Sequence, residues 1–367
     1  MECLKIHEEV RLIDGYLRSV AYDLPRSEFF FLPKSLSVFL KKNDKKPLVL
    51  FKGNDFFIDF KEFLINNEIV FIEDGSLMKN FSKLNIEWKS PYLITNCIID
   101  ILDFDFNLFR KQLEIIETLN IKHVHFNLKK NINKKNLKFL IEELNSSCLQ
   151  SIDFLITKST EKHVIDLLNI CVDYTRVRKI YIPDDLVINF KTDKVNYLSL
   201  IYYNYSTESA STIYNFTVNI SFFTEAHFYN SYFNRKLYIT ADGLLKNSPE
   251  CIDEFGNILN LNSPKKLTDI ILSNKFSKYS KANKDKCDVC KDCEFRYMCN
   301  DNRLPKQRNN NEWFYESECS YNPYIAKWSN ENGYLSLQKC GIETNKNGFK
   351  IDKRKIDTIN KNLWDND

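Results

Sequence analysis

The sequence predicts an α/β protein in which a small module precedes a strand–helix alternating segment and a cysteine-rich region follows it. Three observations lead to this class. Between residues 90 and 235, apolar β-type runs alternate with helical patterns, which favours βαβ units and a parallel sheet. Residues 1–89 combine a hairpin pattern with helix patterns. Seven of the cysteines lie between residues 236 and 345, and the remaining residues, 346–367, form a polar tail.

The first 89 residues predict a small winged-helix-like module. Two strand-like runs, Gly15–Leu24 and Glu28–Leu32, are separated by a Pro-Arg-Ser turn, which is typical of a hairpin. Pro33 suits the first turn of a following helix. A second helix over about Phe57–Asn66 and a closing strand at Ile69–Ile72 complete the module.

Residues 90–235 carry the alternation. The β-type runs are Tyr92–Ile101, His123–Leu128, Ser151–Ile156, Val177–Ile182, Tyr197–Tyr203 and Phe216–Phe222. The helical patterns between them are Leu108–Leu119, Lys134–Leu144 and Glu161–Tyr174. About six strands in about 150 residues predict a partial (β/α) barrel or a curved open sheet.

Residues 236–345 begin with a hairpin pattern around Asp242-Gly243 and then carry the cysteine cluster. The tail after residue 345 is rich in Lys, Asn and Asp, and we expect it to be loosely packed.

Composition limits the function classes. The net charge of the 367 residues is only +3, which does not indicate a nucleic-acid partner. The start Met1–Glu9 has no apolar signal core, and no apolar run is long enough to cross a bilayer. We therefore expect a cytoplasmic protein without a membrane partner. With eight glycines and no phosphate-binding glycine pattern, any ATP chemistry needs a partner protein.

The cysteine cluster predicts a metal site. Cys290, Cys293 and Cys299 lie within ten residues and Cys319 follows, so four thiolates are available for one site. An all-thiolate set suits zinc or a [4Fe–4S] cluster equally. Cys251 and Cys287 are possible additional ligands, each without an obvious set of partners.

The pattern Cys-x2-Cys-x5-Cys, a gap and a last Cys resembles SPASM domains, the C-terminal domains of many radical-SAM peptide maturases. Further stretches resemble the SPASM protein of grasp-with-spasm peptide-modification systems. These stretches are Phe233–Tyr238, Cys290–Arg303 and Glu318–Trp328, while Asn247–Ile258 resembles the upstream cysteine and glycine of SPASM domains in general. The resemblance implies an auxiliary [4Fe–4S] cluster, a ribosomally made precursor peptide and an ATP-grasp ligase as partner.

The chain departs from that family at the radical-SAM cluster motif. The motif needs Cys-x3-Cys-x2-Cys after the first barrel strand, but here Cys97 is followed by Ile101 and Phe104. The second strand also lacks the Gly-Gly-Glu that meets the methionine amine. We therefore expect a degenerate radical-SAM-like barrel that uses no S-adenosylmethionine and is not a functional radical-SAM enzyme on its own.

Winged-helix modules at the front of peptide maturases often capture a leader peptide, which adds as a strand to a sheet edge. In this chain the edge would come from residues 16–24 or 28–32. The candidate peptide-binding residues are Tyr16, Arg18, Tyr22, Leu24 and Phe30.

Taken together, the sequence predicts an accessory or scaffold protein in ribosomal peptide maturation that binds a precursor peptide and acts with an ATP-grasp ligase. Two alternatives stay open at this point. One is an iron–sulfur peptide-modifying enzyme whose chemistry lies in the SPASM domain. The other is a zinc-stabilised structural or interaction protein.

Overall fold

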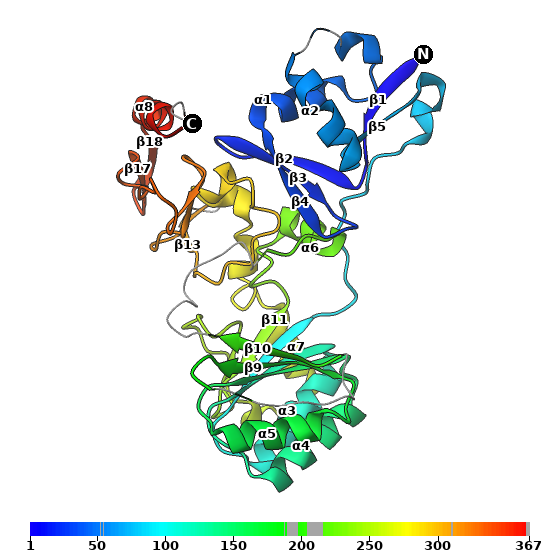
Figure 1. Cartoon of the computed structure of the whole chain (residues 1–367). Coiled ribbons are helices and arrows are strands. Elements are labelled where there is room, and N and C mark those ends of the chain that lie inside the picture. The colour runs from blue at the N-terminus through cyan, green and yellow to red at the C-terminus, as the bar shows by residue number, and fades with distance from the viewer. Residues whose placement is uncertain are drawn as a thin grey trace. The chain divides into compact units, whose positions relative to one another are not determined.

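The computed structural model describes residues 1–51, 53, 55–186, 188, 197–203, 216–309 and 311–364. The chain forms two compact units (Figure 1). The sheet unit comprises Ser90–Ser209 and Tyr232–Ser280. The cysteine-rich unit comprises Met1–Lys89, Ala210–Ser231 and Lys281–Asp367, so three separate chain segments build it. The division at residues 89, 235 and 345 stays a prediction.

The sheet unit contains a seven-stranded sheet of order β10-β9-β8-β7-β6-β11-β12. Its strands are β6 (Asn96–Ile101), β7 (His123–Leu128), β8 (Ser151–Ile156), β9 (Val177–Pro183), β10 (Ser199–Tyr203), β11 (Lys236–Ile239) and β12 (Leu245–Lys246). All neighbours are parallel except β11 and β12, which form the predicted antiparallel hairpin. This confirms the predicted α/β class, with a mostly parallel sheet consistent with a partial barrel.

Helices cover one face of this sheet (Figure 1). They are α3 (Phe106–Thr118), α4 (Lys134–Ser146) and α5 (Glu161–Cys171), and α7 (Pro264–Leu272) follows later in the chain after a 3-10 turn at Ile258–Asn260. Helix α3 begins at a capping side chain, because Asp105 accepts the backbone N–H of Leu108. Along β7, Val124 and Phe126 are buried in the core with the helices. The alternation of the strand places His123 and His125 on the opposite face.

The first part of the cysteine-rich unit contains two small antiparallel sheets. Strand β1 (Glu2–Ile6) pairs with β5 (Val70–Asp74), and β2 (Val10–Asp14), β3 (Arg18–Asp23) and β4 (Glu28–Pro33) form a three-stranded sheet. Their helices are α1 (Lys34–Asn43), α2 (Asp55–Asn66) and the 3-10 turns Leu48–Phe51 and Gly75–Asn80. The predicted hairpin and helices are confirmed, while the winged-helix assignment stays a prediction.

The second part of this unit consists of short elements. The helices are α6 (Ile220–Phe228) and α8 (Lys353–Trp364), and there are 3-10 turns at Tyr279–Lys281, Lys284–Lys286 and Cys290–Asp292. Three strand pairs complete it: β13 (Lys306–Asn309) with β14 (Glu312–Phe314), β15 (Tyr321–Asn322) with β16 (Lys327–Trp328), and β17 (Ile342–Asn345) with β18 (Gly348–Ile351). A set of short elements with little regular pairing depends on side-chain contacts between them for its shape.

Two local predictions are wrong. The strand expected at Phe216–Phe222 is largely replaced by α6, because Asn219 caps that helix by accepting the N–H of Phe222. The tail is not loosely packed, because β18 and α8 occupy it and Ile356 is fully buried among apolar side chains.

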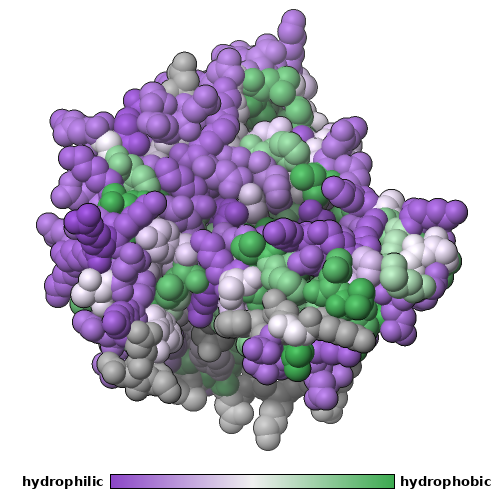
Figure 2. Space-filling view, turned by 90° about the horizontal axis from the view of Figure 1, so that it is seen from above, coloured by the Kyte–Doolittle hydropathy of each residue, from purple (hydrophilic) through white to green (hydrophobic). Residues whose placement is uncertain are grey.

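The face drawn in Figure 2 is mostly hydrophilic, with apolar side chains gathered in separate patches. Exposed apolar residues of the N-terminal part include Phe31, Val38 and Ile58. Scattered exposed apolar side chains are ordinary, so only those with a further structural feature indicate a binding surface. Among the residues that the structure describes, no helix combines the length and hydrophobicity needed to span a bilayer.

The stacked pair Phe126 and Phe154 gives a test of the sheet core, because both rings are fully buried with centroids 5.8 Å apart. We expect Phe126→Ala to lower the free energy of unfolding by about 3–5 kcal/mol, since a large cavity replaces the ring. Leu102→Ala, at a position 43% exposed, serves as the control and should change it by less than about 0.5 kcal/mol. Urea denaturation followed by circular dichroism measures both. A loss below about 1 kcal/mol for Phe126→Ala would contradict this packing.

Candidate metal centre

The four predicted thiols line one small cavity within the cysteine-rich unit. Cys290 opens the 3-10 turn Cys290–Asp292 and Cys293 ends it, while Cys299 pairs through its backbone with Phe216 and Cys319 precedes β15. All four contribute to a cavity of about 30 Å³, whose lining also includes aromatic rings such as that of Phe295. The structure thus brings together cysteines that are up to 29 positions apart (319 minus 290).

These thiols sit in surroundings that disfavour a free thiolate. Burial raises the pKa of Cys290, Cys293 and Cys299. Lys284 acts in the opposite direction on Cys290 and Cys299. Without a metal these three thiols would therefore stay protonated at neutral pH, whereas a bound metal ion deprotonates a coordinating thiol outright.

The donor set fits a thiophilic metal. Four sulfur donors around one apolar cavity suit zinc or an iron–sulfur cluster, and hard cations prefer oxygen ligands. As the side chains stand, no three His, Cys, Asp or Glu groups within the described residues are arranged to hold a metal ion. Binding would therefore require the thiols to turn inward. Ligation by Cys290, Cys293, Cys299 and Cys319 stays a prediction.

The two further candidates lie elsewhere. Cys287 is fully buried, and its Sγ lies 3.4 Å from the Asn283 carbonyl oxygen instead of lining the cavity. Burial raises the pKa of Cys287 to about 12. Cys251 belongs to the sheet unit, where its Sγ lies 3.3 Å from Ser248 Oγ. Both behave as buried thiols with local hydrogen bonds.

The backbone just before Cys290 is strained. Val289 has a φ of 65°, which is an outlier for a β-branched residue. The N–H of Cys290 donates to the carbonyl oxygen of Asp288 at 2.7 Å, which closes a tight γ-turn around Val289. The Asp288 carboxylate is in turn bound by Arg308 at 2.5 Å and by Thr344 at 2.9 Å. The contacts of Asp288 therefore stabilise a turn of unfavourable backbone conformation, and this turn sets the position of the Cys290 thiol.

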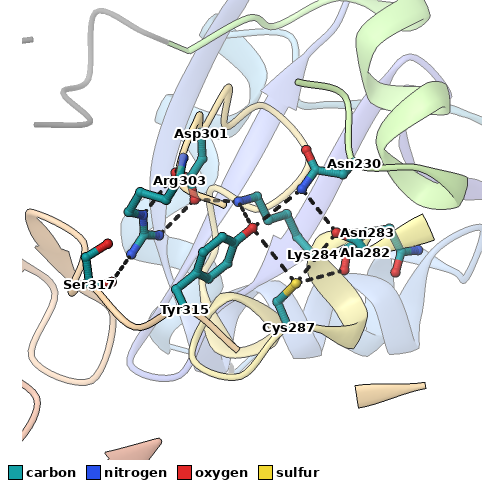
Figure 3. Close-up of polar contacts among 9 residues, drawn as sticks. All are labelled: Asn230, Ala282, Asn283, Lys284, Cys287, Asp301, Arg303, Tyr315 and Ser317. Atoms are coloured by element: carbon teal, nitrogen blue, oxygen red, sulfur yellow. Dashed lines mark hydrogen bonds and ion pairs between the residues drawn. The ribbon is translucent and has the colours of Figure 1, made fainter. Parts of the chain in front are cut away.

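A buried polar network adjoins the cavity (Figure 3). Lys284 Nζ lies 2.6 Å from Asp301 Oδ2 and 2.9 Å from the Tyr315 hydroxyl. Arg303 donates two hydrogen bonds to the same carboxylate, at 2.9 and 2.8 Å, and a third to the Ser317 carbonyl oxygen at 2.7 Å. Burial would raise the pKa of Asp301, but Lys284 and Arg303 lower it well below its usual range. The network was not found from the sequence, although Lys284 and Arg303 stand close to the cysteines there.

The Glu294 carboxylate joins the thiol segment to the N-terminal sheet. It is fully buried and accepts hydrogen bonds from Arg18 Nε at 2.7 Å and from the Tyr321 hydroxyl at 2.5 Å. The Tyr22 hydroxyl also donates to the backbone oxygen of Glu294. At Gly15 an added Cβ would lie 2.5 Å from Glu294 Oε2, so only glycine permits this close approach.

The structure places the predicted peptide-binding residues in contacts within the unit, and their role in peptide binding stays a prediction. Tyr22 and Leu24 are buried inside the unit, and Arg18 is engaged by Glu294. The Tyr16 N–H donates to the Asp292 carbonyl oxygen at 2.7 Å, and Phe30 packs on the apolar core. Residues 18–23 form the central strand of their sheet and therefore offer no free edge. The alternative edge, residues 28–32, lies in β4 and is retained.

The positions of the radical-SAM motif are occupied by apolar packing in the sheet unit. Cys97 is buried in the core between sheet and helices, where burial raises the pKa of its thiol. Ile101 is buried in the same core, and the Phe104 ring packs against that of Phe109 with centroids 5.6 Å apart. Cys97 therefore points toward the helices, and the motif positions that follow it hold the apolar side chains of Ile101 and Phe104 in place of thiols.

Replacing one candidate ligand tests the centre. We expect Cys293→Ala to abolish the metal content of anaerobically purified protein, because three thiolates leave a tetrahedral or cluster site incomplete. Cys148→Ala, which removes a partly buried thiol of the sheet unit, should retain the wild-type content. Elemental analysis for iron and zinc measures both. Equal metal content in the two variants would exclude Cys293 as a ligand.

Comparison with known proteins places few constraints on the chain. No family model and no curated protein matches it. Among solved structures, it matches Streptococcus suis SuiB bound to S-adenosylmethionine with a TM-score of 0.28 and 11% identity, over 81% of this chain and 94% of that chain. SuiB bound to the precursor peptide SuiA matches with the same TM-score, identity and coverage. At this level of similarity, the fold and function of the chain are argued from its own residues.

Proposed function

We propose that this chain is an accessory protein of ribosomal peptide maturation, which holds a thiolate-ligated metal centre and presents a precursor peptide to an ATP-grasp ligase. The observation that carries the proposal is the position of β4. Its outer edge has no strand beside it among the described residues, and its aromatic side chains contact the segment that bears the thiols.

The edge of β4 suits an extended peptide. A free edge offers backbone N–H and C=O groups that a peptide pairs with by adding a strand. Phe31 is 42% exposed there, and the Arg18 guanidinium lies 3.8 Å from the centre of its ring. Phe29 and Phe31 both contact Phe295, two residues after Cys293. A peptide on this edge would therefore lie next to the proposed metal centre.

The sheet unit supports an accessory role over an independent radical enzyme. Apolar packing at Cys97, Ile101 and Phe104 leaves no thiolate triad to hold a catalytic cluster. The chemistry would then come from a partner, and the resemblance to grasp-with-spasm systems names an ATP-grasp ligase. The absence of a phosphate-binding glycine pattern agrees with ATP binding by that partner.

A zinc-stabilised interaction protein is the second candidate, and the donor set favours it. Four thiols line one cavity, and structural zinc prefers four tetrahedral thiolates. A brown anaerobic preparation would indicate an iron–sulfur cluster, and a colourless one containing zinc would indicate a structural ion.

Peptide binding is tested on β4. We expect Phe31→Ala to weaken binding of the precursor peptide encoded beside this chain by about tenfold, since exposed aromatic anchors carry much of the energy of such interfaces. Val38→Ala, which removes another exposed apolar side chain from α1, should leave the affinity unchanged. Isothermal titration calorimetry measures the dissociation constants.

The outcomes separate the proposal from its rivals. No binding by the wild-type protein at about 50 µM peptide would refute a peptide-binding role. Binding that is equally affected by Val38→Ala and Phe31→Ala would place the peptide away from the β4 edge.

A further inference from the structure

The polar network beside the thiols carries an excess of positive charge. Lys284 and Arg303 share a single carboxylate, that of Asp301, so the three groups sum to a charge of +1. The Lys284 and Asp301 side chains are 5% and 1% exposed, and that of Arg303 is 14% exposed. A buried ion pair needs only one cation for one carboxylate, and an uncompensated buried charge is costly. The second cation therefore needs another anion.

Thiols are among the strongest further electrostatic partners of both cations. After Asp301 and Tyr315, the groups that act on Lys284 are Cys290 and Cys299. After Asp301, those that act on Arg303 are Cys319 and Cys290. No second carboxylate contacts either cation among the described residues. The excess charge thus lies beside the thiols of Cys290, Cys299 and Cys319, with which both cations line one cavity.

Lys284 also has a free donor on this side. Its ammonium group carries three N–H bonds, of which Asp301 and the Tyr315 hydroxyl accept two. The third has no acceptor among the residues that the structure describes, and the side chain lines the thiol cavity together with Arg303. Tyr315 is itself buried and holds Lys284 in place, with the ammonium 4.7 Å from its ring centre.

We propose that Lys284 and Arg303 are positioning residues that balance the charge of a negatively charged tetrathiolate centre held by Cys290, Cys293, Cys299 and Cys319. Four thiolates around a metal core of charge +2 leave a net charge of −2, which two buried cations tethered by one carboxylate partly offset. The inference rests on the proposed metal centre. Under this inference, the main role of the Lys284–Asp301–Arg303 network is to retain the metal, and its contribution to folding is the lesser one.

The test uses Co²⁺ as probe, because its thiolate charge-transfer absorbance reports binding whichever metal the protein holds in the cell. Full-length apoprotein is reduced anaerobically and titrated. We expect Lys284→Met to weaken Co²⁺ binding by about 10- to 100-fold, as for other residues that contact metal ligands. The Lys284→Met variant leaves Arg303 and Asp301 as a pair whose charges cancel. Lys286→Met, which removes an equal charge from an exposed position of the same turn, is the control and should match the wild type.

A second variant separates charge from structure. Asp301→Asn removes the anion and leaves two cations facing the sulfur atoms, so charge balance predicts Co²⁺ binding at least as tight as in the wild type. A purely structural network predicts weaker binding for Asp301→Asn and Lys284→Met alike. Circular dichroism of each apoprotein establishes whether it folds. If Lys284→Met does not fold, the test is whether Asp301→Asn tightens or weakens Co²⁺ binding.

Each outcome has one meaning. If the wild-type protein takes up no Co²⁺, the proposed metal centre fails and this inference fails with it. If the wild type binds Co²⁺ but Lys284→Met matches Lys286→Met, the centre stands and the role of Lys284 is overturned. Weaker binding in Asp301→Asn would also overturn it.

Discussion

The cysteine-rich unit depends on one buried carboxylate, that of Glu294. Burying a carboxylate costs free energy unless cations and donors compensate it, and here Arg18 and Tyr321 both bind Oε1 of Glu294. Glu294 directly follows Cys293, so its partners also fix the position of a candidate ligand. Aromatic rings, including that of Phe295, then close the cavity around the sulfur atoms. The N-terminal sheet and the thiol segment are in this sense one structure.

The order of the strands in the N-terminal sheet limits which strand edge a peptide can pair with. Strand β2 was not predicted, so the hairpin of β3 and β4 seemed to offer two edges. In the structure β3 lies between two partners, and the side chains of Tyr22 and Leu24 pack inside the unit. The sheet order leaves β2 and β4 as its two edge strands, and Phe31 is exposed on β4. Of the two edges predicted from the sequence, the β4 edge is therefore the one we propose for the peptide, and its aromatic side chains contact the thiol segment.

How much could be predicted from the sequence follows the range of the interactions. Strands β7 and β8 were predicted at their observed residues, because each is a short run with apolar side chains at alternate positions, set between helical patterns. Helix α6 was missed, since its aromatic and β-branched residues resemble a strand and only the cap at Asn219 indicates otherwise. The thiols were found by their spacing. The role of Glu294 was not, because its partner Arg18 lies 276 positions away and burial of a charge is a tertiary property.

The assembly of this unit from three chain segments has a consequence during synthesis. The apolar faces of β2 and β3 pack against residues from α6 and from the segment that ends near Tyr321. At about 5–20 residues per second, the ribosome needs on the order of tens of seconds after finishing residue 89 to supply those partners. The N-terminal sheet would be translated early yet completed late, while the intervening sheet unit has its own core and can fold in the meantime. Nascent chains of this protein therefore expose an apolar, aromatic surface for much of translation. Such a surface is the kind that a chaperone at the ribosomal exit tunnel binds.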